Sequence, residues 1–274
     1  MLFQEIVLGT FYSRRLGISL GMNLMPIHEK LCTFDCVYCE CGFNTPVTHP
    51  QLPSREEIRQ ALEIKLQTMQ AQHRNEGEQS DDYLDVITFS GNGEPTLHPD
   101  FEGIIADTCA LRNQYCPHAK VSVLSNSTQL GRADVVRALK MCDNRILKLD
   151  SALDTTMRLI DRPNNHELTV AQVMQWLGQF EGDFILQTCF LRGNVPSFEV
   201  KTNDKTAYVA IDNTTKQEVE VWYAMVHQLR PKQVMIYVID RATPIKTLSK
   251  IPREQMEAIA TPLREEGFDV FVSA

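Results

Sequence analysis

Residues 31–42 read LCTFDCVYCECG, so four cysteines, Cys32, Cys36, Cys39 and Cys41, fall within ten positions. The sequence has no signal-peptide pattern and no run of about 18 apolar residues, so we expect a cytoplasmic protein without a membrane span. Thiols are kept reduced in that compartment, where clustered cysteines indicate metal or redox chemistry instead of a disulfide framework. We therefore expect this segment to bind a metal-containing cofactor.

The first three cysteines have the spacing C-x3-C-x2-C, and the spacing restricts what they bind. A structural zinc site needs four ligands, commonly from two close pairs, and no second C-x2-C pair exists. Three thiolates suit a [4Fe–4S] cluster that leaves one iron open to a small molecule. Cys41 is not expected to be a ligand, because a C-x-C pair aims both sulfurs to one side only in an extended loop. The other cysteines stand alone in the sequence: Cys109, Cys116, Cys142 and Cys189.

Along the rest of the chain, short apolar runs alternate with stretches of helical periodicity. Such alternation without a break in composition predicts one parallel sheet covered by helices. Several runs, such as DVITFS and QVMIYVID, are apolar almost throughout, as strands buried on both faces are. This α/β pattern alone fits both an open sheet and a barrel. The strands are expected at 18–24, 85–90, 120–125, 145–149, 183–190 and 233–239, with a seventh C-terminal strand at 268–272.

The predicted helices follow cap signals. Ser54 with Glu57 three positions on is a capping box, and Gly267 is a C-cap glycine. Helices are expected at 55–72, 101–114, 134–141, 169–180, 216–229 and 252–266. We expect a single domain over 1–274. Residues 193–212 are long for a βα loop and are expected to be a surface insertion or a lid, with a small hairpin turning at Asn203-Asp204.

A second motif, SGNGEPTLHP at 90–99, follows the second predicted strand. Together with C-x3-C-x2-C and the aromatic Tyr38 before its last cysteine, it resembles the radical S-adenosylmethionine (SAM) superfamily. The resemblance covers about residues 20–244. It implies a partial (β/α)6 TIM barrel, which decides between the two sheet architectures.

The resemblance also implies chemistry. Cys32, Cys36 and Cys39 would ligate one [4Fe–4S] cluster, whose open iron binds SAM. An electron from a flavodoxin or ferredoxin would cleave SAM to a 5′-deoxyadenosyl radical, which abstracts hydrogen from a substrate. The protein would supply placement and exclude water.

Further SAM contacts are implied at strand ends. The turn Asn92-Gly93-Glu94 would meet the methionine ammonium, although Asn92 stands where the family usually has glycine. Ser125 and Asn126 end the third predicted strand and would give polar contacts. Asp150 is expected near the ribose hydroxyls.

Lys148 and Asp150 lie two positions apart on one strand and so point to one face. Lys148 would meet the SAM carboxylate, or the two residues would form an internal ion pair. Lys148, Gln187 and Tyr237 are candidate catalytic residues, while Cys189 is expected to be a buried apolar residue.

The segments SRRLGISLGMNLMP and FSGNGEPTLHP look most like the uncharacterised Fe–S oxidoreductases grouped near the tRNA wyosine-base synthases. The additional N-terminal cysteines of the wyosine enzymes are absent before Cys32. The net charge of −8 offers no global attraction to nucleic acid. We therefore expect a small-molecule or peptide substrate, anionic if the arginines expected at the barrel mouth bind it: Arg14, Arg15, Arg192 and Arg241. The alternatives are a tRNA-modifying radical SAM enzyme and a non-catalytic Fe–S or zinc regulatory protein.

Overall fold

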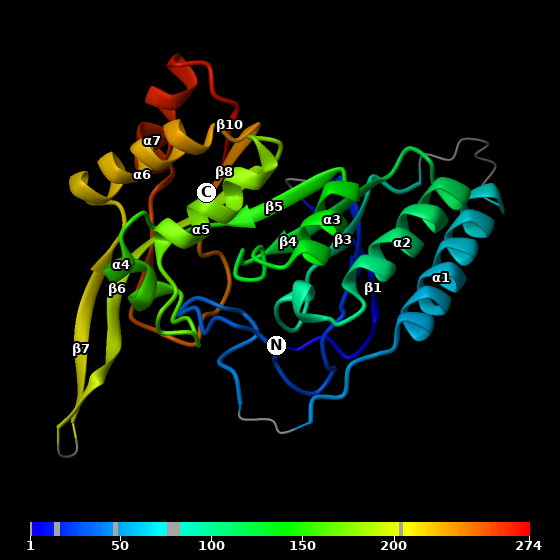
Figure 1. Cartoon of the computed structure of the whole chain (residues 1–274), viewed down its shortest axis with the longest axis horizontal. Helices are drawn as coiled ribbons and strands as arrows, with labels where there is room; N and C mark the ends of the chain where they lie inside the picture. Colours follow the sequence, from blue (N-terminus) through cyan, green and yellow to red (C-terminus); the bar gives the residue numbers. More distant parts are fainter. Residues whose placement is uncertain (1, 14–16, 46–48, 76–82, 203–204) are drawn as a thin grey trace. The chain divides into compact units, whose positions relative to one another are not determined.

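The computed structural model describes residues 2–13, 17–45, 49–75, 83–202 and 205–274. The chain divides into two compact units, which are described one at a time (Figure 1). The first unit comprises Met1–Cys32 and Asn44–Ile146, and the second comprises Thr33–Phe43 and Leu147–Ala274. The cysteine segment therefore begins in the first unit and continues in the second.

The first unit is built on a sheet in the order β1-β2-β3-β4. β1 pairs antiparallel with β2, whereas β3 runs parallel to both of its neighbours. Leu20, Ile87 and Val121 stand in register across the three parallel strands and are fully buried, which explains the continuous apolar runs. The strands are β1 (Val7–Ser13), β2 (Gly17–Met22), β3 (Val86–Phe89) and β4 (Lys120–Ser125). β5 (Asn144–Lys148) begins in this unit and ends in the other.

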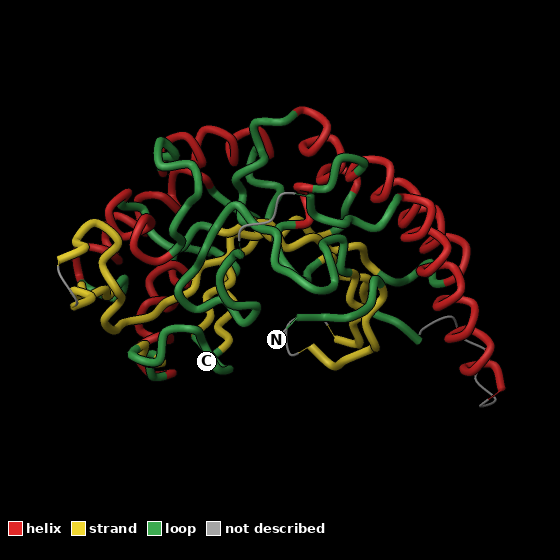
Figure 2. Tube along the Cα trace, turned by 90° about the horizontal axis from the view of Figure 1, so that it is seen from below, coloured by secondary structure: helices red, strands yellow, loops and turns green. Residues whose placement is uncertain are grey.

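Helices of the first unit lie along one side of its strands (Figure 2). The capping box at Ser54 is formed as predicted, since Ser54 N donates to Glu57 Oε2 at 2.7 Å and Glu57 N donates to Ser54 Oγ at 3.3 Å. The helices are α1 (Arg55–Asn75), the short 3₁₀ turn η1 (Pro95–Leu97), α2 (Phe101–Tyr115) and α3 (Ala133–Met141).

The second unit contains a parallel group of strands, β6-β8-β10, and two strands antiparallel to β6. These are β6 (Ile185–Thr202), β7 (Lys205–Asp212), β8 (Gln233–Val238), β9 (Leu248–Lys250) and β10 (Val270–Ser273). The helices are α4 (Asp154–Ile160), α5 (Val170–Leu177), η2 (Gly178–Phe180), α6 (Lys216–Leu229) and α7 (Arg253–Glu265).

The six predicted internal strands and the C-terminal strand are all present, as are the six predicted helices. The sequence interpretation missed β1, α4 and β9. The described residues of the segment 193–212 belong to the antiparallel pair β6–β7, in which Arg192 pairs with Asp212. The predicted turn residues Asn203 and Asp204 lie outside the described residues, and the lid role of this segment stays a prediction.

A hydrophobic core in the second unit receives part of the cysteine segment. Val37 is fully buried and packs with Ile160, Cys189 and Leu191, while Tyr38 packs against the same group. This part of the segment thus belongs to the core of the unit, whereas Cys39 and Cys41 are half-buried and Glu40 is exposed. In the part of the chain that the structure describes, no helix has the length and apolarity needed to span a membrane.

Candidate functional site

In the first unit, the start of the cysteine segment is bound to the Gly-Glu-Pro turn. Leu31 forms a parallel bridge with Gly93: Leu31 N donates to Asn92 O at 2.9 Å, and Glu94 N donates to Leu31 O at 3.0 Å. A Cβ on Gly93 would lie 1.7 Å from Leu31 O. The glycine is therefore required by the backbone that leads directly into Cys32.

The Glu94 carboxylate is buried and receives its hydrogen bonds from protein groups. Ser125 Oγ donates to Oε1 at 2.8 Å, Asn126 N donates to Oε2 at 2.7 Å, and Thr96 donates through both its N and its Oγ1. Burial raises the pKa of Glu94, against the lowering effect of these hydrogen bonds. Three of the predicted SAM-contact residues, Glu94, Ser125 and Asn126, thus meet in one cluster.

Asn126 also contacts the first cysteine, because its Nδ2 lies 3.5 Å from Cys32 Sγ. The Asn92 side chain, by contrast, is fully buried and binds backbone, donating to Phe3 O and Pro26 O at 2.8 Å each. Asn92 therefore holds the N-terminal segment against the turn. A contact between the main chain of Asn92 and SAM stays a prediction.

In the second unit, the rest of the cysteine segment lies along residues 160–164. Val37 N donates to Ile160 O and Asp35 N to Asp161 O, both at 2.9 Å, and Phe34 forms an antiparallel bridge with Pro163. Asn164 N donates back to Thr33 O at 2.9 Å. Arg162 has a φ of 50°, an uncommon conformation for a residue with a side chain, which turns the chain out of α4. This ladder fixes the backbone on both sides of Cys36.

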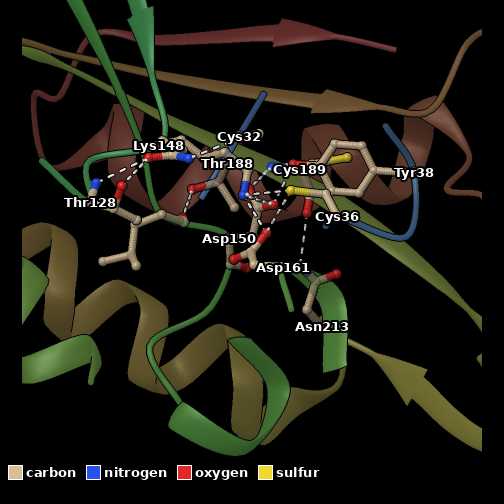
Figure 3. Close-up of polar contacts among 12 residues, drawn as sticks. Cys32, Cys36, Tyr38, Thr128, Lys148, Asp150, Asp161, Thr188, Cys189 and Asn213 are labelled. Carbon is tan, nitrogen blue, oxygen red and sulfur yellow. Dashed lines mark hydrogen bonds and ion pairs between the residues drawn. The ribbon is translucent and has the colours of Figure 1, made fainter. Parts of the chain in front are cut away.

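Lys148 lies at the centre of a polar network beside Cys36 (Figure 3). Its Nζ lies 3.0 Å from Asp150 Oδ2, forms a short ion pair with Asp161 Oδ1 and lies 3.7 Å from Cys36 Sγ. Burial favours the neutral amine, but the charges of Asp150 and Asp161 outweigh it and raise the pKa of Lys148 well above its usual value. Burial also raises the pKa of Asp161, although the charge of Lys148 opposes that shift. The internal Lys148–Asp150 ion pair considered from the sequence is thus formed.

Asp150 joins this network to two tyrosines and to β6. Tyr38 OH donates to Asp150 Oδ2 at 2.5 Å, and Cys189 N donates to Asp150 Oδ1 at 2.9 Å. Tyr237 OH donates to Tyr38 OH at 3.3 Å. Burial, followed by the nearby Asp150 charge, raises the pKa of Tyr38 well above its usual value. Both carboxylate oxygens of Asp150 accept from protein donors, so its expected contact with the ribose stays a prediction.

Cys189 and Tyr237 stand opposite each other on β6 and β8, which explains their proximity. Cys189 is fully buried, as expected of an apolar residue, and Gln187 is buried two positions earlier on β6.

Two residues of this site were missed by sequence reasoning. Asp161 contacts both Lys148 and Cys36 Sγ, the latter at 3.5 Å, but it ends a seven-residue helix with no recognisable motif. Asn213 donates to Asp150 O at 2.9 Å and to Cys189 O at 2.8 Å, and it accepts from Leu191 N. Asn213 lies just before α6, and no motif in the sequence marks it as part of this site.

The arginines expected to bind substrate have protein partners where they are described. Arg192 Nη2 donates to Thr214 Oγ1 at 3.0 Å and to Gln255 Oε1 at 2.5 Å. Arg241 Nη1 pairs with Glu40 Oε2 at 2.8 Å. Arg14 and Arg15 lie outside the described residues.

Two of the three thiols expected to ligate an iron–sulfur cluster have a protein N–H donor beside the sulfur. Among the described residues, no three His, Cys, Asp or Glu side chains converge as the ligands of one metal ion do. A cluster is held by thiolates at wider spacing, and N–H groups that point at the sulfurs stabilise it. Asn126 Nδ2 at Cys32 and Lys148 Nζ at Cys36 are such donors.

Sequence comparison finds distant relatives of greater length. No protein-family profile matches the chain. It is 26% identical over 256 residues (92% of the chain) to a protein named GTPase Obg from Brachyspira hyodysenteriae, of which the match spans 32%. It is 29% identical over 192 residues (68% of the chain) to a UPF0026 protein from Methanocaldococcus jannaschii, of which the match spans 54%. The chain therefore spans less than two thirds of the length of either relative.

Structure comparison gives a consistent fold. SuiB from Streptococcus suis, solved with S-adenosylmethionine bound, superposes with a TM-score of 0.60 at 11% identity, over 93% of this chain and 50% of SuiB. A second SuiB structure holds its precursor peptide SuiA, with the same TM-score and identity, over 93% of this chain and 48% of SuiB. TYW1 with a lysine–pyruvate adduct gives a TM-score of 0.59 at 11% identity, over 90% of this chain and 73% of TYW1. These neighbours are radical SAM enzymes, and the chain has the fold of the radical SAM enzymes.

Proposed function

We propose that this protein is a radical SAM enzyme with one [4Fe–4S] cluster, ligated by Cys32, Cys36 and Cys39, that acts on a small-molecule or peptide substrate. The observation that carries the proposal is the bridge between Leu31 and Gly93, because it joins the two motifs of the superfamily physically. The fold supports it, and so do the N–H donors at Cys32 and Cys36.

When bound, the cluster would supply one electron to cleave SAM into methionine and a 5′-deoxyadenosyl radical. The residues of the chain would position the cofactors and exclude water. Gly93 and Glu94 shape the turn beside Cys32, and the buried Glu94 carboxylate orders the backbone at Asn126. Tyr38 and Val37 pack into the core and would exclude water from the segment, which protects a radical from reaction with water. Cys189 and Tyr237 present a buried thiol and a phenol that remain protonated, because burial raises the pKa of both.

Two observations bear on the substrate. SuiB is solved with a precursor peptide bound, which supports a peptide as one substrate class. TYW1 is solved with a lysine–pyruvate adduct, which makes wyosine-like chemistry the main alternative. Lys148 does not suit such an adduct, because its two carboxylate partners hold it protonated and an amine must be neutral to attack a carbonyl. We therefore propose the small-molecule or peptide class over tRNA, with a low-potential flavodoxin or ferredoxin as electron donor.

The test begins with cofactor loading. After anaerobic reconstitution the chain should hold about four irons, the content of one [4Fe–4S] cluster. Reduced with dithionite and given SAM, it should release 5′-deoxyadenosine, measured by liquid chromatography and mass spectrometry. The Cys36→Ala variant should lose both, whereas the matched Cys41→Ala variant should keep both. Full iron content in Cys36→Ala would reject the ligand assignment, and iron-loaded protein that releases no 5′-deoxyadenosine would favour the regulatory alternative.

A further inference from the structure

The feature of interest is the contact between the Lys148 ammonium and Cys36 Sγ at 3.7 Å, in the second unit (Figure 3). Lys148 comes from the end of β5, and its side chain is only 11% exposed. A buried ammonium at this distance from a sulfur changes the electrostatic environment of that sulfur strongly, because little solvent screens it.

The ammonium is fixed by two carboxylates that are themselves fixed. Asp161 N donates to Met157 O at 2.7 Å at the end of α4, and Asp161 O accepts from Asp35 N of the cysteine segment. Asp150 is held by Cys189 N and by Tyr38 OH. Lys148 Nζ therefore cannot move away from Cys36 without breaking two buried ion pairs, which is strongly unfavourable.

Asp161 places an opposite charge on the same sulfur. Its Oδ1 lies 3.5 Å from Cys36 Sγ, and in the described structure its Oδ2 is buried and accepts no hydrogen bond. Cys36 thus lies between one cationic and one anionic group, both immobile. Lys148 should stabilise negative charge at the sulfur, and Asp161 should destabilise it.

We propose that Lys148 and Asp161 are positioning residues that set the reduction potential of the iron–sulfur cluster ligated by Cys36, Lys148 raising it and Asp161 lowering it. The inference rests on the cluster ligation of the proposed function, and it does not require SAM cleavage. Reduction adds one electron, supplied by a low-potential donor such as dithionite, and no bond is made or broken. A hydrogen bond or positive charge at a ligand sulfur stabilises the reduced state, and a negative charge destabilises it.

The experiment compares Lys148→Met, Asp161→Asn and a matched control, Lys232→Met. Lys232 pairs with Asp183 at 3.1 Å in the same unit, and its side chain is 38% exposed, so the control removes the same charge from a solvent-screened position. The midpoint potential of each reconstituted, SAM-free protein is measured by dithionite titration followed by electron paramagnetic resonance, alongside iron content. We expect Lys148→Met to be at least tenfold harder to reduce, a shift of about 59 mV to more negative potential for a one-electron couple. Asp161→Asn should shift the potential to more positive values, and Lys232→Met should leave it unchanged.

Opposite shifts in the two variants separate this role from a structural one, which would give loss of iron or shifts of one sign. An unchanged potential in Lys148→Met overturns the proposal. If that variant also binds SAM more weakly, Lys148 is assigned to SAM binding instead. If Lys148→Met loses its iron, Asp161→Asn decides: a positive shift supports the proposal, and any other result, including loss of iron, overturns it. Failure of the unsubstituted chain to take up iron would instead reject the proposed function.

Discussion

Gly93 shows how a single residue joins two motifs that lie about sixty positions apart in the sequence. The backbone of Leu31 passes so close that a Cβ at position 93 would meet Leu31 O at 1.7 Å, and the φ of Gly93 is +152°. The sequence predicts that the turn Asn92-Gly93-Glu94 contacts SAM. In the structure, the missing side chain of Gly93 leaves room for the backbone of the cysteine segment.

We therefore expect Gly93→Ala to displace Leu31 and break the bridge that precedes Cys32. Overpacking of this kind costs about 3 kcal/mol of unfolding free energy, and iron uptake should fall with it. Denaturant unfolding and iron analysis measure the two effects. Gly178→Ala is the matched control, since nothing lies within 4 Å of a Cβ there. Equal stability and equal iron content in the two variants would contradict this account.

Asn213 also acts at the scale of one residue. Its side chain binds three backbone groups, Leu191 N at 2.8 Å, Asp150 O at 2.9 Å and Cys189 O at 2.8 Å, and is almost fully buried. Asn213→Leu keeps the branched shape of the side chain but leaves these groups without that partner. Each unsatisfied buried group costs about 1–3 kcal/mol.

We expect Asn213→Leu to lower the free energy of unfolding by about 3 kcal/mol or more, as measured by denaturant titration. Asn194→Ala, at an exposed position on β6, the strand that Asn213 contacts, should change it little. If Asn213→Leu leaves the free energy of unfolding nearly unchanged, the backbone groups that Asn213 binds do not depend on its side chain for stability.

At the scale of elements, prediction succeeded where the signal was local. β3, β4 and β8 were identified because strands buried on both faces give continuous apolar runs, and α6 was predicted at its observed bounds. α4 has seven residues and β9 has three, too few for a periodic pattern to emerge. Strand alternation placed Lys148 and Asp150 on one face, where they form the ion pair that was one of two alternatives. Asp161 was missed because its partners, Cys36 and Lys148, are brought to it only by tertiary packing.

The capping box of α1 gives a pH-dependent prediction for one element. The hydrogen bonds from Ser54 to the Glu57 carboxylate lower the pKa of Glu57. A lowered folded-state pKa adds stability above the unfolded-state pKa of about 4.3, and that stability is lost as the pH falls through the folded value. Ser54→Ala should therefore lower the melting temperature at pH 7, and the difference from the unsubstituted chain should shrink below about pH 4. Thermal melts at both pH values test it, and a difference that does not change with pH would contradict the link to Glu57.

At the scale of the whole molecule, charge separates the two substrate classes. The chain has 27 lysines and arginines against 35 acidic residues. The basic residues expected near the strand ends have acidic or polar partners where they are described: Lys148 with Asp150 and Asp161, Arg192 with Gln255, and Arg241 with Glu40. Affinity for nucleic acid comes mainly from cations that neutralise phosphates, and paired cations contribute less of it.

We therefore expect tRNA to bind no more tightly than the non-specific range of about 10⁻⁴–10⁻⁶ M at physiological salt. Fluorescence anisotropy with a labelled tRNA measures this, and a salt series gives the number of phosphates contacted, because the slope of log affinity against log salt scales with that number. A shallow slope and equal competition by an unrelated tRNA would agree with a small-molecule or peptide substrate. Saturable binding below 1 µM to one tRNA, with a steep slope, would contradict it. In that case the likeness to the wyosine-base synthases would guide the search for a substrate, and Arg14 and Arg15 would be the first residues to substitute in a search for phosphate contacts.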